Sequence, residues 1–356
     1  MKAITLFSSA GIDEAYLSAI GIDVIAANEL LVKRAKIHEW LYPNCKMIIG
    51  DICNKNVFEK ICNEIEKNKI EMLIATPPCQ GMSIAGKNKN NKDMINDKRN
   101  HLIFKVIDLI EKYNFKYVLI ENVARFLNVK YPYSIENSID LYTIEEILNY
   151  KLSDKYEIYC KVFDCADYGI PQYRKRAIIR IYKKGLVWND PKPSKHITVE
   201  MAIGYLPSLE SGEISEIPYH YARKHNDKHI NWMKHTPTGE TALDNEKFYP
   251  TKRDGSRIRG FNTCYKRMRW DLPAPTVTIR SDAISSQNNV HPGRLLPDGT
   301  YSDARVLTIK ELFILMSLPN DFQLPEWLSD TEIRQIIGEG VPPLLIKKIL
   351  EGIKHD

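Results

Sequence analysis

Short apolar runs alternate with helix-like patterns through the first half of the chain, and this alternation limits the fold more than any other feature. The predicted strands cover residues 3–7, 24–27, 47–49, 72–75 and 117–120. Apolar residues repeat at helical spacing over 12–20, where Gly21 can end the helix, and again over 102–110. Strands that alternate with helices predict a parallel, doubly wound α/β sheet, whose ligands bind at the carboxyl ends of the strands.

The pattern changes in the second half of the chain. Two further strands, which could form a hairpin, are predicted at 156–164 and 176–182. Sequence containing Pro, Gly and His then follows without clear periodicity, and helical patterns return at 308–317 and 343–353. We therefore expect an α/β domain over 1–184, a smaller irregular domain with a hinge over 185–333, and a C-terminal helical segment over 334–356 that returns to the first domain.

Composition places the 356-residue chain among globular proteins, with 44% apolar and 27% charged residues. No run approaches the roughly 20 apolar residues of a membrane span, and the first residues, MKAITLFSSAGI, are typical of a strand rather than a cleavable leader. The seven cysteines include no CxxC pair. This odd count predicts reduced thiols in a cytosol, without a disulfide framework or a structural metal.

Basic residues are concentrated between residues 247 and 280, although the net charge of the whole chain is only +5. Nine basic residues stand there against two acidic ones, with aromatic residues between them. A solvated face could have this composition, but basic and aromatic residues together in an irregular segment favour a nucleic-acid partner.

Cys79 follows the predicted strand 72–75 almost at once, after Thr76, Pro77 and Pro78. Proline fixes φ and lacks an N–H, so the strand must end there. Cys79 could be a buried apolar residue. Its place in a rigid turn at a strand end also suits a nucleophile.

The loop 7–11 after the first strand is compatible with a nucleoside cofactor that lacks phosphates. Ser9 and Glu14 occupy the first and third glycine positions of a dinucleotide fingerprint, and Glu14 would repel a pyrophosphate. Glu29 and Asp51 end the next two strands, where they could accept hydrogen bonds from ribose hydroxyls and an adenine amino group. Both acids could equally be ordinary turn or cap residues.

Glu121 ends the strand 117–120, at the same predicted sheet edge as Cys79. Arg174 and Arg176 alternate, so a strand would point both side chains to one face. These residues could be a helix-start acid and solvated arginines. Together with Cys79 they favour covalent catalysis assisted by an acid.

Six segments in order resemble the DNA (cytosine-5) methyltransferase family, of the bacterial modification-enzyme type. They are LFSSAGI, PPCQGMS, ENV, QYRKR, ARVLTIKELFILMSLPNDF and GEGVPPLLIKKI. The resemblance covers most of the chain outside residues 185–270. It implies a Rossmann-like, S-adenosylmethionine-dependent catalytic domain and a target-recognition domain.

The resemblance also implies catalytic roles. Cys79 would attack carbon 6 of a flipped-out cytosine in duplex DNA, which activates carbon 5 to take the methyl group. Glu121 would contact N3 and the exocyclic amino group. Arg176 would bind the base carbonyl oxygen, and Arg174 would contribute to the site and a nearby phosphate. The products would be methylated DNA and S-adenosylhomocysteine, with no metal involved.

Binding residues follow from the same resemblance. The implied cofactor residues are Phe7, Ser9, Gly11, Glu29, Asp51, Ile52, Pro78, Leu102 and Val341. The candidate DNA-binding residues are Gln80, Ser83, Lys87, Gln172, Arg253, Arg257, Arg259, Arg267 and Arg269. Ser9, Leu30 and Glu339 depart from the family pattern, which often has glycine, an aromatic residue and asparagine at these positions. We expect weaker cofactor binding from them, not loss of activity.

The predicted partner is double-stranded DNA, and a separate cognate restriction endonuclease is a second possible partner of what we expect to be a monomer. A tRNA cytosine-5 methyltransferase of the same fold is the main alternative. An inactive DNA-binding module is disfavoured by the four catalytic candidates. A nucleotide-dependent dehydrogenase is disfavoured by Ser9 and Glu14.

Overall fold

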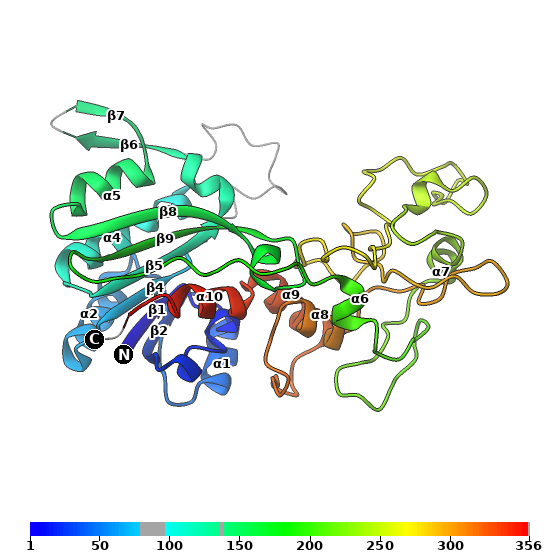
Figure 1. Ribbon diagram of the computed structural model, residues 1–356, viewed down its shortest axis with the longest axis horizontal. Helices are drawn as coiled ribbons and strands as arrows, with labels where there is room; N and C mark the ends of the chain where they lie inside the picture. The colour runs from blue at the N-terminus through cyan, green and yellow to red at the C-terminus, as the bar shows by residue number, and fades with distance from the viewer. Residues whose placement is uncertain (79–96, 136–137, 355–356) are drawn as a thin grey trace. The chain divides into compact units, whose positions relative to one another are not determined.

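The chain forms two compact units in the computed structural model, which describes residues 1–78, 97–135 and 138–354 (Figure 1). Unit 1 comprises Met1–Asp164, Lys175–Pro191 and Lys347–Asp356. Unit 2 comprises Cys165–Arg174 and Lys192–Ile346. The limits of these two units differ from the domain limits expected at 184/185 and 333/334. The expected limits concern the functional domains and stay predictions.

Unit 1 is built on a seven-stranded sheet with the order β3-β2-β1-β4-β5-β9-β8. Its strands are β1 (Lys2–Leu6), β2 (Asp23–Glu29), β3 (Lys46–Ile49), β4 (Met72–Ala75), β5 (Tyr117–Val123), β8 (Tyr156–Asp164) and β9 (Lys175–Lys183). The first five are parallel, whereas β9 is antiparallel to both β5 and β8. The expected α/β sheet and the hairpin of its last two strands are confirmed.

Helices bury one face of this sheet. Apolar side chains of β1, β4 and β5 share a core with those of α2 (Lys55–Asn68), α4 (Ile103–Lys112) and α5 (Ile144–Leu152). The other elements of unit 1 are α1 (Val32–Leu41), the turns η4 (Lys98–His101) and η5 (Ala124–Asn128), and a separate hairpin of β6 (Lys130–Ile135) and β7 (Ser138–Thr143). The core fixes the strands, and therefore the residues at their ends.

The helix predicted over 12–20 is wrong. The segment instead forms two short 3₁₀ turns, η1 (Ile12–Glu14) and η2 (Ser18–Ile20). Gly11 and Gly21 bracket it, and both adopt left-handed φ values, of 72° and 74°. Such residues end helices, so the short stretch between them turns twice and forms no α-helix.

Unit 2 is largely irregular, as expected for this part of the chain. Its regular elements are the turns η6 (Cys165–Tyr168) and η7 (Ala242–Asp244) and the helices α6 (Val199–Ile203), α7 (Asp227–Lys234), α8 (Ile309–Leu315) and α9 (Asp330–Glu339). The last helix, α10 (Pro343–Leu350), spans the boundary between the units.

A buried charge network joins distant segments of unit 2. Arg305 is fully buried and donates to the carboxylates of Asp303 and Glu311 at 2.8–2.9 Å, and to the Leu209 carbonyl at 2.7 Å. Burial opposes ionisation of Glu311, but the charge and hydrogen bonds of Arg305 outweigh it and lower the pKa of Glu311 to about 2. The carboxylate also accepts from the Thr308 backbone in the capping box of α8. Arg305 therefore holds unit 2 together.

We expect Arg305→Met to destabilise the protein by about 3–5 kcal/mol, because it leaves two buried carboxylates without their cation. Arg269→Met is the control, since Arg269 pairs with Asp271 on the surface, where solvent screens the pair, and its loss should leave stability nearly unchanged. Urea unfolding of both variants measures the difference. Equal losses would contradict the structural role of Arg305.

Candidate active site

The candidate site lies at the carboxyl edge of the parallel strands in unit 1. The loop 7–11 follows β1, Glu29 ends β2, Asp51 comes soon after β3, and Glu121 lies near the end of β5. Parallel pairing brings these strand ends to one edge, which is where ligands bind in open α/β sheets. The sheet therefore brings together the acids that the sequence singled out.

Glu29 organises the loop 7–11. Its carboxylate accepts from the Ser9 backbone N–H at 2.8 Å and from the Leu31 N–H at 2.7 Å. Phe7 and Ser9 have left-handed φ values of 60° and 47°. Non-glycine residues adopt this conformation at a cost of about 1–2 kcal/mol, so the glycine usual at the position of Ser9 would relieve strain.

Gly11 lies under an aromatic ring. The Tyr42 hydroxyl donates to the Gly11 carbonyl at 2.6 Å. A Cβ atom at residue 11 would lie 2.5 Å from a Tyr42 ring carbon and 2.8 Å from His38. Only glycine fits this turn, both for its space and for its φ.

Glu14 is buried beside His38, a contact that sequence reasoning missed. The His38 Nε2 lies 3.1 Å from both carboxylate oxygens, and the imidazole is fully buried. Burial opposes protonation of His38, but the charge and hydrogen bonds of Glu14 outweigh it and raise the pKa of the imidazole. The charge expected to repel a pyrophosphate is therefore partly compensated by His38.

Glu121 and Arg176 form an ion pair with 2.8 Å between Oε1 and Nε. In the β5–β9 ladder Val123 lies opposite Arg176, so Glu121 and Arg176 are diagonal neighbours on one face. Both side chains are largely buried. An acid and a guanidinium held in this way can present a hydrogen-bonding edge to one planar ligand.

Asn122 links β5 to the turn after β4. Its side-chain amide donates to the Pro77 carbonyl at 3.0 Å, and the residue is buried. Pro77 lies two residues before Cys79. Asn122 follows Glu121 directly in the sequence, and this position was the only sequence feature that could have indicated its contact with Pro77.

Cys79 itself and three predicted DNA-binding residues, Gln80, Ser83 and Lys87, lie outside the described residues. Among the predicted cofactor residues, Asp51 is exposed and accepts from the Cys53 N–H at 2.8 Å. The others are half-buried or buried, as found for Ile52, Pro78, Leu102 and, in unit 2, Val341.

Arg174 and Gln172 lie in the interior of unit 2. The Arg174 guanidinium is buried and donates to the carbonyls of Val277, Gly338 and Gly340 at 2.6–3.0 Å. Arg174 precedes β9, so the expectation that it shares a strand face with Arg176 is wrong. Gln172 is also fully buried, and its side chain bonds the backbone of Val277 and Leu315. These side chains hold the backbone of unit 2, and the phosphate and DNA contacts expected for them stay predictions.

Arg267 is held in a similar way. It is 1% exposed, and its guanidinium donates to the backbone carbonyls of Met233, His291, Tyr301 and Asp303. These bonds give Arg267 a structural role, and its DNA contact stays a prediction.

The other four basic candidates are exposed. Arg269 pairs with Asp271, and Arg257 lies over the Tyr249 ring at 4.1 Å while donating to the carbonyls of Leu243 and Asn245. Arg253 and Arg259 are also on the surface. DNA binding by these four stays a prediction.

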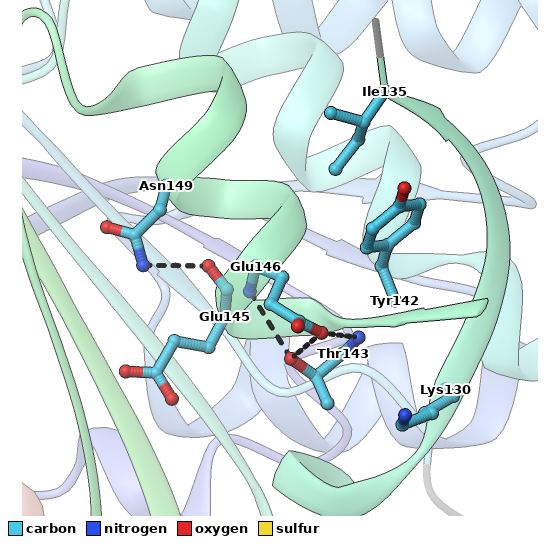
Figure 2. A pocket seen from close by; sticks show the side chains of 7 residues that line it. All are labelled: Lys130, Ile135, Tyr142, Thr143, Glu145, Glu146 and Asn149. Carbon is cyan, nitrogen blue, oxygen red and sulfur yellow. Dashed lines mark hydrogen bonds between the residues drawn. The ribbon is translucent and has the colours of Figure 1, made fainter. Parts of the chain in front are cut away.

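A cavity of about 680 Å³ lies elsewhere in unit 1, between the β6–β7 hairpin and α5. Figure 2 shows that Thr143 and Glu146 bond each other there as the capping box of α5. Asn149 donates to the Glu145 carbonyl. The cavity contains none of the predicted site residues, and its polar groups serve the helix, so it is not the candidate active site.

None of the described helices is long and apolar enough to cross a membrane. The described residues also contain no group of three or more His, Cys, Asp or Glu side chains that could hold a metal ion.

The mostly parallel seven-stranded sheet is consistent with the Rossmann-like fold of methyltransferases. The chain belongs to the C-5 cytosine-specific DNA methylase family, whose model matches residues 1–355. The family expected from the sequence is therefore confirmed.

Individual relatives agree with this assignment. The type II methyltransferase M1.HgaI of Avibacterium volantium is 52% identical over 356 residues, 100% of this chain and 99% of the relative. M1.HphI of Haemophilus parahaemolyticus is 28% identical over 98% of this chain and 86% of its own. A candidate DNA modification methyltransferase from an E. coli prophage has a TM-score of 0.68 at 20% identity, covering 99% and 98% of the two chains. That last likeness concerns the fold alone.

We expect Gly11→Ala to destabilise the protein by about 2–5 kcal/mol, from a left-handed φ and a clash with Tyr42. Gly21→Ala is the matched control, because Gly21 has nearly the same φ but nothing within 4 Å of the place where a Cβ atom would lie. It should cost only about 1–2 kcal/mol. Chemical denaturation compares the two, and equal losses would argue against the clash.

Proposed function

We propose that this DNA methylase transfers a methyl group from S-adenosylmethionine to carbon 5 of a flipped-out cytosine in duplex DNA, through a covalent bond to Cys79. The observation that carries the proposal is the buried pair of Glu121 and Arg176 at the carboxyl edge of the sheet. Asn122 ties the same strand end to Pro77, just before the nucleophile. Acid, guanidinium and thiol would thus act on one base.

The proposed steps follow from the chemistry of these groups. The Cys79 thiolate adds to carbon 6 of cytosine, and Glu121 supplies a hydrogen bond or proton at N3, so the ring becomes electron-rich at carbon 5. Arg176 holds the carbonyl oxygen of the base and, through its ion pair, keeps Glu121 in place. After carbon 5 is methylated, loss of its proton allows the bond to Cys79 to break.

S-Adenosylmethionine would supply a methyl group on a positively charged sulfur. The residues at the sheet edge fit a cationic nucleoside without phosphates. Glu29 and Asp51 retain lone pairs for ribose and adenine donors beyond the backbone amides that they accept. Phe7 can stack on the adenine. Leu102, Ile52 and Pro78 of unit 1 would complete the site, and Val341 of unit 2 stays a predicted cofactor residue.

The proposed substrate is double-stranded DNA, and base flipping is needed because carbon 6 is hidden in the stack. Exposed Arg253, Arg257, Arg259 and Arg269 of unit 2 are the candidate contacts. The type II relatives support a restriction–modification role with a separate endonuclease. They favour DNA over the tRNA alternative. A cytosolic monomer is the corresponding expectation for location and assembly.

Trapping with a DNA duplex containing 5-fluorocytosine tests the covalent step. Because fluorine cannot leave as a proton does, we expect a stable adduct that requires S-adenosylmethionine, seen as a shifted band on a denaturing gel. Cys79→Ala should form none. Cys53→Ala is the matched control, since Cys53 is exposed in unit 1 and should leave the adduct intact. An adduct with Cys79→Ala would contradict the assignment of Cys79 as the nucleophile.

Glu121→Gln tests the acid. The amide is nearly isosteric but cannot donate a proton to N3, so we expect methyl transfer to slow by roughly 10²–10⁴-fold while the cofactor still binds. Single-turnover assays with labelled cofactor measure the rate. Glu145→Gln, at an exposed acid beside the cavity of Figure 2, should retain the full rate. A Glu121→Gln rate within threefold of the original rate, a difference of about 0.7 kcal/mol in activation free energy, would contradict this role.

A further inference from the structure

Thr76 is a polar residue next to the candidate site that the proposed mechanism does not use. It is the first residue after β4 and is half-buried. Its hydroxyl group donates to the carbonyl of Phe7, in the loop 7–11, with 3.0 Å between Oγ1 and the carbonyl oxygen. Its backbone N–H donates to the carbonyl of Leu6 at 3.1 Å. Thr76 is therefore bonded both to the end of β1 and to the loop that follows it.

The hydroxyl group of Thr76 replaces a backbone donor that the sequence cannot supply. The parallel pairing of β1 with β4 ends at Leu6 and Ala75. The residues after Thr76 are Pro77 and Pro78, which have no N–H and so offer no backbone donor to the loop. The side-chain donor of Thr76 thus continues the contact between the two segments past the ends of their strands.

This bond matters because the loop 7–11 is strained. Phe7 and Ser9 have left-handed φ values of 60° and 47°. Residues with a side chain avoid this conformation, so the loop keeps it only while bonds from neighbouring segments hold it. Glu29 holds the Ser9 N–H at 2.8 Å, and Thr76 holds the Phe7 carbonyl. The hydroxyl group therefore fixes the start of the loop.

A second side chain holds the turn after β4 from the opposite side. β4 lies between β1 and β5 in the sheet. Buried Asn122 of β5 donates to the Pro77 carbonyl at 3.0 Å, while Thr76 reaches the loop after β1. The two proline rings fix φ at residues 77 and 78. Two hydrogen bonds and two prolines thus restrict the position of Pro78 relative to the loop 7–11.

The spacing of these two segments concerns the cofactor, and this step rests on the function proposed above. Phe7 and Pro78 are both half-buried candidate cofactor residues, one on each segment. Dispersion contacts weaken steeply with distance, since a gap of about 0.5–1 Å loses a quarter to a half of the attraction. Both residues can therefore contact one ligand only while the spacing of their segments is kept.

We propose that Thr76 is a positioning residue for S-adenosylmethionine. Its hydroxyl group holds the loop 7–11 to the turn 76–78, so that Phe7 and Pro78 keep the spacing that the nucleoside part of the cofactor requires. Thr76 acts through these two residues and does not itself contact the cofactor. Without the hydroxyl group, only a fraction of the molecules has the binding geometry, and the apparent affinity falls by that fraction.

Calorimetry of the full-length protein with S-adenosylmethionine and S-adenosylhomocysteine tests the proposal. Thr76→Val keeps the branched shape but removes the hydroxyl group, so we expect Kd to rise about fivefold for both ligands, the size of one typical hydrogen bond. Thr76→Ser retains the hydroxyl group and should stay within about twofold of the unaltered protein. An unchanged Kd in Thr76→Val, or equal weakening in Thr76→Ser, would overturn the role of Thr76.

Thr143→Val is the matched control for a merely structural role. Thr143 is also a half-buried threonine of unit 1 with a bonded hydroxyl group, but it caps α5 beside the cavity of Figure 2. Its loss should lower the stability of the protein and leave the Kd of both ligands unchanged. Calorimetry separates the two roles, because unfolded protein lowers the number of binding sites whereas a displaced loop raises Kd. Equal rises in Kd for Thr143→Val and Thr76→Val would contradict the proposal.

The outcomes also separate this inference from the proposed function. If the unaltered protein binds neither ligand, the cofactor assignment fails and the role of Thr76 fails with it. If the unaltered protein binds both ligands and Thr76→Val binds them equally well, only the inference fails. If Thr76→Val does not fold, Thr76→Ala is measured in its place with the same expected rise in Kd, and an unchanged Kd overturns the inference.

Discussion

A buried carboxylate is stable only where cations or N–H groups surround it, and the carboxyl edge of the sheet in unit 1 is built around this constraint. Glu29 is held by two backbone amides, Glu14 by His38, and Glu121 by Arg176. Each partner comes from a different element, so every acid fixes the position of another part of the chain. The loop 7–11, the start of α1 and the pairing of β9 on β5 all depend on these contacts.

Secondary structure was predicted correctly where a sequence pattern is compatible with only one backbone conformation. Apolar runs such as 72–75 became β4, and the prolines after them end that strand because they cannot continue a ladder. The parallel sheet and the hairpin of β8 and β9 followed. The helix over 12–20 failed because apolar spacing carries no information about left-handed φ at Gly11 and Gly21.

Side-chain roles were harder to predict than strands. Sequence patterns singled out Glu121 and Arg176, and the antiparallel pairing of β5 with β9, which was not predicted, makes them neighbours. They give no sign that Arg174, Arg267 and Arg305 are buried, since an arginine looks equally basic inside and outside. Irregular backbone leaves many carbonyl groups without a ladder partner, and in unit 2 these buried guanidiniums supply the donors. Part of the basic character of that unit therefore serves its folding.

Arg174 and Arg176 are separated by one residue, yet each belongs to a different unit. The first guanidinium bonds carbonyls of unit 2, whereas the second pairs with Glu121 of unit 1. A single inserted residue between them would turn every side chain of β9 to the opposite face while Arg174 stayed in place. The spacing of this arginine pair thus satisfies two unrelated requirements at once.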